Sequence, residues 1–551
     1  MGTSALEQEL RQAFSRRGVV IASMELRSYP GEINAIIFVD DGSYARALEA
    51  AEDIEVSYDD EEGLLIIVRR ARAHDAVPAD QAEGRGVHSK VANDLVSLIS
   101  ARNRVSEVQP SLSYVKDLTA NITTVTAARH HLIFGRRGAG KSTLMVEAKR
   151  IAEERGDVTA WINLQTLRRE EFSRIFLRVA RAMIEELLAR ASQERISARP
   201  VTELGAVYER LGALIAKDEL SPDEASRLIP DVQHAIKRAL ELLGVQLFVF
   251  VDDFYYVPRA DQPELLDVLH GCVRDCKAWL KIASIRHLTR WFTSNPPRGL
   301  QTGQDADIID LDVTLEDPLK ARGFLTDILF QYATEAGSRH LSSLFRAEAL
   351  NRLVLASGGV PRDFLVLAAA GISKARTREK ARLVGVQDIN QVAGDAADAK
   401  IQELEEDLAA NAGASSQALD ALTMLRTFCL TDKSTTFYAV DFRDKETHPK
   451  EYAVFTDLQD LRLVHLIHRA VSSAHDAGQK TEVFILDLSQ YTGSRLKQGL
   501  RVFDLEEDAI VVKTTRSSKT KDRRAKSSRE VLTLLRTAPV LELETFTGLT
   551  S

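Results

Sequence analysis

The stretch HLIFGRRGAGKSTLM, from His131 to Met145, constrains the fold of this chain more than any other part of it. Its apolar start predicts a β-strand, its glycines predict a tight loop, and the residues after the loop predict a helix that ends at Gly156. A strand that turns through glycines into a helix presents backbone N–H groups at the positive end of that helix, where anions bind. The stretch therefore predicts an open α/β sheet with an anion site at one edge.

The loop fills every fixed position of the pattern G-x-x-x-x-G-K-[ST] between Gly135 and Ser142. Its glycines let backbone N–H groups approach phosphate oxygens without a Cβ in the way. Lys141 supplies a point charge for the β- and γ-phosphates, and the Ser142 hydroxyl can coordinate Mg²⁺. We expect nucleotide contacts along the whole loop, at Gly135, Arg136, Arg137, Gly138, Ala139, Gly140, Lys141, Ser142 and Thr143.

A second apolar segment, VQLFVFVDDFYYV, predicts a buried strand that ends in two acids. We expect Asp252 to associate with the Mg²⁺ and Asp253 to polarise the attacking water. The alternative is that both are ordinary carboxylates at the end of a strand. The loop and the acid pair together predict a nucleotide hydrolase.

The segment AWLKIASIRHLTRWF predicts a further strand from Ile282 to Ile285. Its carboxyl end delivers Ser284 and Arg286 to the sheet edge where ligands bind in open α/β sheets. We expect Arg286 to sense the γ-phosphate, with Arg290 as a second candidate. The alternative for Arg286 is a solvated side chain in a loop.

A Gly-Gly-x-Pro turn in LASGGVPRDFLVLAA fixes the start of a helix, because Pro favours the first helical turn. Arg362 then projects from a defined position, from which it can reach the nucleotide out of a second domain. A plain helix–helix turn is the alternative.

Composition bounds the remaining possibilities. Hydrophobic residues make up 44% and charged residues 28% of the chain, as in soluble globular proteins. The net charge of −8 gives no global footprint for nucleic acid, so DNA contact would need a local basic patch. The three cysteines indicate a reducing compartment, with Cys272 and Cys276 expected as buried apolar fillers rather than metal ligands. The apolar runs are too short to span a membrane, which predicts a cytoplasmic protein.

A chain of 551 residues predicts three or four domains. The predicted fold class is α/β: a P-loop NTPase αβα parallel-sheet core with a helical lid, a small N-terminal α/β domain and a C-terminal winged-helix-like domain. The expected parts are a small α/β domain at 1–72, a linker at 73–104, the P-loop core at 105–312, the helical lid at 313–410, the winged-helix-like domain at 411–505, and a basic, flexible tail at 506–551.

The C-terminal region predicts helices followed by a β-hairpin, with one helix at 448–461. In a winged helix that bound DNA, the second helix would enter the major groove. Acidic residues weaken that helix as a DNA ligand, so the better candidates are Arg462, Arg469, Lys480 and the basic tail at 513–529. Protein docking by the same domain, and a simple solvated charge run in the tail, are the alternatives.

These motifs in this order resemble the AAA+ ATPases, in the branch of origin-recognition and replication-initiator ATPases and their STAND relatives. The resemblance covers roughly residues 105–400. It implies an αβα ATPase core, a helical lid and often a C-terminal winged helix, with Arg362 at the place of the lid's sensor arginine. IASIRH and GGVP look like the STAND patterns hhhTTR and G-x-P. The chain has no N/T-K-x-D motif for reading guanine, which favours ATP as the nucleotide.

Three functions fit these features. The first is an ATP-dependent regulatory switch in which Arg286 and Arg362 report the γ-phosphate and accessory domains self-associate or bind a protein partner. The second is a DNA-associated motor or loader that uses the winged helix and the basic tail. The third keeps ATP as a structural ligand without turnover.

Overall fold

The computed structural model describes most of the chain. The described residues are 3–21, 23–29, 32–39, 43–57, 63–70, 86–102, 121–286, 288–313, 315–408, 414–472, 479–492, 499–506, 509–514 and 523–549. They divide into two compact units, Met1–Glu83 and Gly84–Ser551.

The first unit is a small α/β domain, as the sequence predicts. Its elements are α1 (Thr3–Arg16), β1 (Ser23–Tyr29), β2 (Glu32–Val39), α2 (Tyr44–Ser57) and β3 (Gly63–Arg70). β2 lies in the middle of the sheet, antiparallel to β1 and parallel to β3. Ile33, Ala35 and Ile37 alternate along β2 and are buried with residues of both helices, as expected for one covered face of a sheet. The strand β1 was not predicted, because SMELRSY mixes polar and apolar residues.

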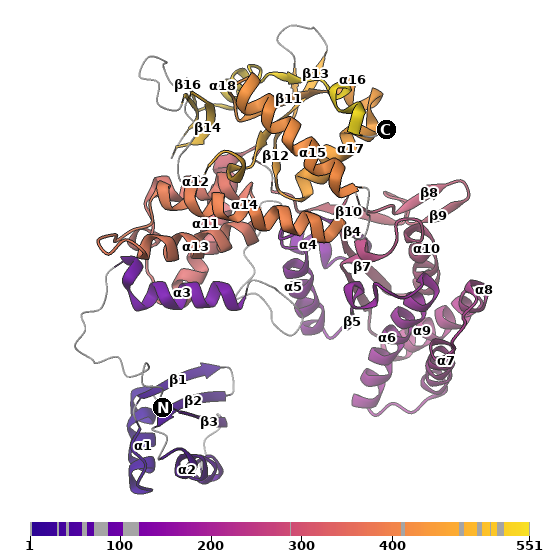
Figure 1. The fold of residues 1–551 in the computed structure, drawn as a ribbon. Helices are drawn as coiled ribbons and strands as arrows, with labels where there is room; N and C mark the ends of the chain where they lie inside the picture. Colours follow the sequence, from indigo (N-terminus) through magenta and orange to yellow (C-terminus); the bar gives the residue numbers. More distant parts are fainter. Residues whose placement is uncertain are drawn as a thin grey trace. The chain divides into compact units, whose positions relative to one another are not determined.

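The second unit contains a five-stranded parallel sheet, which confirms the predicted core (Figure 1). Its strands are β4 (His130–Phe134), β5 (Val158–Asn163), β6 (Leu247–Asp252), β7 (Ala278–Ser284) and β10 (Ala306–Asp310). Their spatial order is β10-β4-β7-β6-β5. The order puts β7 between the strand of the loop and the strand of the acid pair. The residues that follow β7 therefore emerge between the two halves of the predicted site.

Helices cover both faces of this sheet. Ile133, Phe250 and Ala283 are buried with α5 (Lys141–Glu154) and α4 (Asn121–Val125) on one face. Residues of opposite parity, such as Leu132 and Val249, are buried on the other face. That face is covered by α6 (Phe172–Gln193), α7 (Arg199–Ile215), α8 (Pro222–Ser226), α9 (Ile229–Leu243) and α10 (Gln262–Val273). A short hairpin of β8 (Phe292–Ser294) and β9 (Pro297–Gly299) precedes β10.

Four helices form the predicted lid, and a fifth joins them from a segment expected to be a linker. The lid helices are α11 (Pro318–Glu335), α12 (Ala347–Ser357), α13 (Pro361–Arg376) and α14 (Val386–Leu408). The fifth helix, α3 (Lys90–Ala101), buries Ala92, Leu95 and Ile99 among them. The interpretation of 73–104 as a linker is therefore wrong for α3, whose apolar spacing of three and four gives it a core-facing stripe. Residues 73–85 lie outside the described residues.

The C-terminal region, here meaning the described residues from 414 to 549, begins with the predicted helices and hairpin. Its first elements are α15 (Ala414–Thr427), β11 (Phe437–Asp441), α16 (Phe442–Thr447), α17 (Pro449–Asp460), β12 (Val464–Ser472) and β13 (Lys480–Leu486). β13 pairs antiparallel with both β12 and β11. The helix predicted at 448–461 is α17.

The segment expected as a flexible tail is folded wherever the structure describes it. After β14 (Arg501–Leu505) it contains β15 (Ile510–Thr514), β16 (Arg523–Ala525), α18 (Ser528–Leu535), β17 (Val540–Leu541) and a 3₁₀ segment at Leu543–Leu549. β17 pairs with β11, so the segment completes the C-terminal sheet. The expectation is wrong because the basic residues of the segment are accompanied by apolar ones, such as Leu541, Leu543 and Phe546, which are buried.

We expect Leu543→Ala to lower the free energy of unfolding by about 2–5 kcal/mol, because it removes a fully buried side chain. Glu544→Ala is the matched control: the neighbouring side chain is exposed, so its loss should change stability by less than about 0.5 kcal/mol. Urea unfolding of the full chain measures both. Equal effects of the two substitutions would show that this segment is not part of the folded region.

Candidate phosphate-binding site

The loop Gly135–Ser142, called here the phosphate-binding loop, connects β4 to α5 as predicted. Gly138 and Gly140 have φ values of +80° and +100°, a region that side chains strongly disfavour. Gly140 is the residue before the first turn of α5 and makes no side-chain cap. The first N–H groups of α5 therefore face the loop, in the arrangement that binds phosphate groups.

Lys141, the first residue of α5, folds back into the loop. Its Nζ donates hydrogen bonds to the carbonyl oxygens of Gly135, at 2.7 Å, and Arg136, at 3.2 Å. Burial lowers the pKa of its ammonium group, while the charges of Asp312 and Asp252 act to raise it. The lysine is thus held at the centre of the loop, where a phosphate would meet its charge.

Ser142 and Asp252 come together although they are 110 residues apart in the chain. The Ser142 hydroxyl donates to Asp252 Oδ2 at 2.7 Å. Burial and the neighbouring Asp253 raise the pKa of Asp252 to about 6. A hydroxyl and a carboxylate are hard oxygen donors that suit Mg²⁺, which takes few protein ligands and completes its shell with water and phosphate oxygens. The pair fits the predicted magnesium site.

Asp253 is held by a residue that the sequence analysis did not single out. Its backbone has a φ of +56°, which is uncommon outside glycine. Asn163, at the end of β5, donates from Nδ2 to Asp253 Oδ2 at 3.5 Å. Asn163 is the register partner of Asp252 on the neighbouring strand. A polar residue at the carboxyl end of a predicted strand is the signal that could have identified it.

Ser284 is the last residue of β7 and Arg286 follows the strand, as predicted, and both side chains contact protein groups. Arg286 Nη1 lies 3.4 Å from Asp310 Oδ2, at the end of β10. The hydroxyl of Ser284 lies 2.6 Å from that of Thr289. The backbone of Arg286 follows β7, but its side chain extends over the ring of Phe134 on β4 and away from the acid pair. It pairs there with the carboxylate of Asp310. Arg290 is exposed, and its backbone N–H donates to Gln262 Oε1 at 2.7 Å.

Arg362 reaches the phosphate-binding loop from the lid. Its backbone N–H donates to the Gly138 carbonyl at 3.3 Å. A Cβ added to Gly138 would lie 2.8 Å from the Cβ of Arg362 and 3.0 Å from Cγ1 of Val360. The charge of Arg362 is also close enough to lower the pKa of Lys141. The start of α13 therefore sits directly on the loop.

The two arginines inside the loop have different surroundings. Arg137 lies over the ring of Tyr255, 5.5 Å from its centroid. Arg136 is 4% exposed and donates from Nη2 to the carbonyl oxygens of Val313 and Gly358, each at 3.1 Å. The side chain of Arg136 thus binds protein groups from the lid side of the unit.

The residues predicted to contact nucleic acid differ in exposure. Arg462 is buried and pairs with Asp363 at 2.6 Å, so the expectation that it contacts DNA is wrong for this structure. Its position next to a predicted hairpin indicates an exposed side chain, but in the structure the side chain is buried. Arg469 is exposed but lies within 3.9 Å of Asp310 and 3.8 Å of Glu316. Lys480 is exposed. In the basic segment, residues 515–522 lie outside the described residues.

Searches against known proteins return distant likenesses of fold. No protein-family model and no curated protein matches the chain. Among solved structures, the chain is similar to the ORC1 protein of Aeropyrum pernix in complex with DNA, with 15% identity, a TM-score of 0.36, and coverage of 68% of this chain and 90% of that one. Cdc6p from Pyrobaculum aerophilum gives 14% identity, a TM-score of 0.30, and coverage of 69% and 93%. A RuvB variant from Thermotoga maritima gives 12% identity and a TM-score of 0.28, with coverage of 54% of this chain and 75% of that one.

All three TM-scores lie below 0.5, so these structures carry no argument about the function of this chain. Similarity at this level concerns the fold alone, and the STAND-like features stay a prediction. No helix in the described part of the chain is long and apolar enough to cross a membrane. The geometry of the site, rather than these likenesses, bears on function.

We expect Gly138→Ala to weaken the binding of a fluorescent ATP analogue at least fivefold, because a Cβ there meets Arg362 and Val360 of the lid. Gly156→Ala, at the end of α5, is the matched control. It has a similar φ of +82° with nothing within 4 Å of the added Cβ. Both substitutions should lower stability by roughly 1–2 kcal/mol through the backbone alone. Equal nucleotide affinity in the two variants would contradict a lid that sits on the loop.

Proposed function

We propose that this protein binds and hydrolyses ATP with Mg²⁺ and uses the state of the nucleotide to control the arrangement of its lid helices and C-terminal region. The observation that carries the proposal is the backbone contact between Arg362 and Gly138. Because α13 begins on the loop that would hold the phosphates, a triphosphate there acts on the lid directly. A ligand shifts a conformational equilibrium only through such unequal contacts with its two states.

The side chains of the site divide the chemistry among them. Lys141 binds the β- and γ-phosphates, and Ser142 and Asp252 hold the metal ion. Bound Mg²⁺ neutralises charge on the phosphates. Asp253 orients the attacking water and accepts its proton as the bond from the water oxygen to the γ-phosphorus forms. The bond between the γ-phosphorus and the β–γ bridging oxygen breaks in the same step, and ADP leaves with that oxygen. The contact from Asn163 helps to orient Asp253.

The pairing of Arg286 offers a path from the γ-phosphate to the C-terminal region. Asp310 lies 3.4 Å from Arg286 and 3.9 Å from Arg469 of β12, so the two arginines share one carboxylate. A γ-phosphate that attracts Arg286 leaves Asp310 to Arg469. This change of ion pairs at Asp310 alters the contact between β12 and the parallel-sheet core. A change of contact that depends on the nucleotide is the behaviour of a switch.

A DNA-associated motor or loader is the second candidate. The chain order α15, β11, α16, α17, β12, β13, with a β12-β13-β11 sheet, is compatible with the predicted winged helix. However, α17, the helix that would enter a groove, is partly buried: Val454, Phe455 and Leu458 are buried, whereas Pro449, Lys450 and Ala453 are exposed. Phe455 packs edge-on against Phe546 at 4.9 Å between ring centroids. Burial raises the pKa of Asp457 to about 6, and the nearby charge of Arg259, from the parallel-sheet core, opposes this rise. The acidic residues and the partial burial of α17 favour the switch over DNA binding.

The decisive measurement is ATP hydrolysis by the full chain, with and without duplex DNA. Lys141→Ala should abolish nucleotide binding, and Asp253→Asn should keep binding while lowering turnover by about 10²–10⁴-fold. Lys320→Ala, an exposed lysine on α11, is the control and should leave both unchanged.

The outcomes separate the three functions. Turnover that does not respond to DNA, with protease sensitivity of the lid that differs between ATP and ADP, supports the switch. DNA-stimulated turnover that Lys480→Glu removes would favour the motor. Binding with no turnover in the wild type would leave ATP as a structural ligand, and no binding at all would overturn the proposal.

A further inference from the structure

The side chain of Arg136 links the phosphate-binding loop to the C-terminal region. Its backbone N–H donates to Asp312 Oδ1 at 2.7 Å, and its Nε lies 3.3 Å from the same oxygen. Its Nη1 lies 3.4 Å from Nδ1 of His465, on β12. Residues 136 and 465 are 329 positions apart in the chain and are both almost completely buried. An arginine at the second position of the loop therefore spans from the predicted nucleotide site to another part of the molecule.

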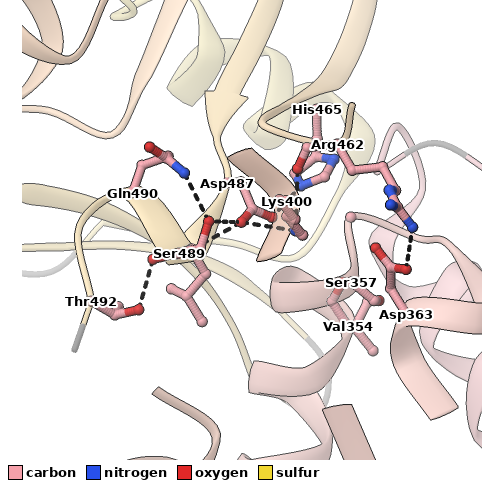
Figure 2. A network of polar contacts seen from close by, with 12 residues as sticks. Val354, Ser357, Asp363, Lys400, Arg462, His465, Asp487, Ser489, Gln490 and Thr492 are labelled. Atoms are coloured by element: carbon pink, nitrogen blue, oxygen red, sulfur yellow. Dashed lines mark hydrogen bonds and ion pairs between the residues drawn. The ribbon is translucent and has the colours of Figure 1, made fainter. Parts of the chain in front are cut away.

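The partners of His465 fix which of its nitrogens carries the proton (Figure 2). Nε2 lies 2.7 Å from Asp487 Oδ2, and the other oxygen of Asp487 pairs with Lys400 at 3.0 Å. A carboxylate held by an ammonium group is ionised and can only accept, so Nε2 carries the hydrogen. The network assigns Nδ1 as the unprotonated nitrogen, with its lone pair toward the guanidinium of Arg136. Burial lowers the pKa of His465, which keeps the ring neutral between the two cations, Arg136 and Lys400.

The same ring also touches the turn that leads into the lid. Gly358 has a φ of +56°, and a Cβ added to it would lie 2.0 Å from Nδ1 of His465. The carbonyl of Gly358 accepts from Arg136 at 3.1 Å. Arg136, Gly358 and His465 thus form one contact shared by the loop, the lid turn and β12. A second buried pair, Arg462 with Asp363 at 2.6 Å, joins the C-terminal region to the first turn of α13 (Figure 2).

We propose that His465 is a positioning residue for the nucleotide: by accepting a hydrogen bond from Arg136 it holds the start of the phosphate-binding loop, so the docked C-terminal region sets nucleotide affinity. The inference rests on the proposed binding of ATP and names how that site is regulated. Arg136 cannot lose its charge, and a buried guanidinium that loses an acceptor must move to find another. Movement of Arg136 shifts the loop and the lid turn together, because both are bonded to it.

Two amide substitutions test the roles of the two imidazole nitrogens of His465 separately. In His465→Asn the amide oxygen can stand where Nδ1 is and still accept from Arg136. In His465→Gln the longer amide reaches the place of Nε2 and keeps the contact with Asp487, but it leaves Arg136 without this acceptor. We expect the affinity for a fluorescent ATP analogue to fall about tenfold in His465→Gln, with faster release, as for the loss of a hydrogen bond to a charged group. His465→Asn should bind within about twofold of the wild type, by the same reasoning.

The experiment uses the full chain and records thermal melting, KM and kcat beside binding. A positioning role predicts a rise in KM with little change in kcat, and a rescue of affinity by Asn that does not follow the melting temperature. Arg136→Lys, which keeps the charge but cannot reach as far, should weaken binding as His465→Gln does. The double variant of Arg136→Lys and His465→Gln should lose less than the sum of the two single losses, because both substitutions break the contact between Arg136 and His465.

Other results overturn the inference. If folded His465→Gln binds the analogue like the wild type, His465 does not position the loop. If Asn and Gln weaken binding equally, in proportion to lost stability, the role of His465 is structural only. Additive losses in the double variant would deny the contact with Arg136. Failure of the wild type itself to bind overturns the proposed function, and this is seen before any variant is made.

Discussion

A guanidinium group carries five N–H donors and a charge that it keeps at any pH a protein survives, so burying one obliges the chain to bring acceptors to it. Arg136 is such a group. Its acceptors come from the residues after β10, from the turn before α13 and from β12, which are three separate stretches of the chain. The geometry of the phosphate-binding loop therefore depends on parts of the fold that lie far outside the loop in sequence.

The order of the strands in the core brings the phosphate-binding loop and the acid pair to the same edge of the sheet. β7 lies between β4 and β6, so the strand before the loop and the strand before the acid pair are separated by one strand, and the backbone of Arg286 follows that strand. Asp310 at the end of β10 then closes the opposite side. Asp310 and Arg136 both contact residues of β12, namely Arg469 and His465. Nucleotide chemistry and domain docking thus share neighbouring residues.

The parts of this arrangement that sequence could predict are those encoded by neighbours in the chain. The loop, the apolar strand before Asp252 and the glycine turn before Arg362 all carry their signal within a dozen residues. Asn163 carries a local signal only in its place at the end of a strand, and its partner Asp253 is 90 residues away. His465 carries no such signal, because its role arises from a partner 329 residues away. The prediction for Arg462 is wrong for a related reason: its buried partner, Asp363, lies 99 residues away in the chain. The C-terminal segment was misjudged because its charged residues obscured apolar ones that only the fold assembles.

The long separations around Arg136 also have a consequence for the order in which the site matures during synthesis. The loop leaves the ribosome early, but His465 follows 329 residues later. At elongation rates of about 5–20 residues per second, this interval lasts tens of seconds, during which the upstream domain can already fold. Throughout that time Arg136 lacks its last acceptor. In the nascent chain the phosphate-binding loop therefore lacks the contact between Arg136 and His465. This contact can form only after β12 has been synthesised.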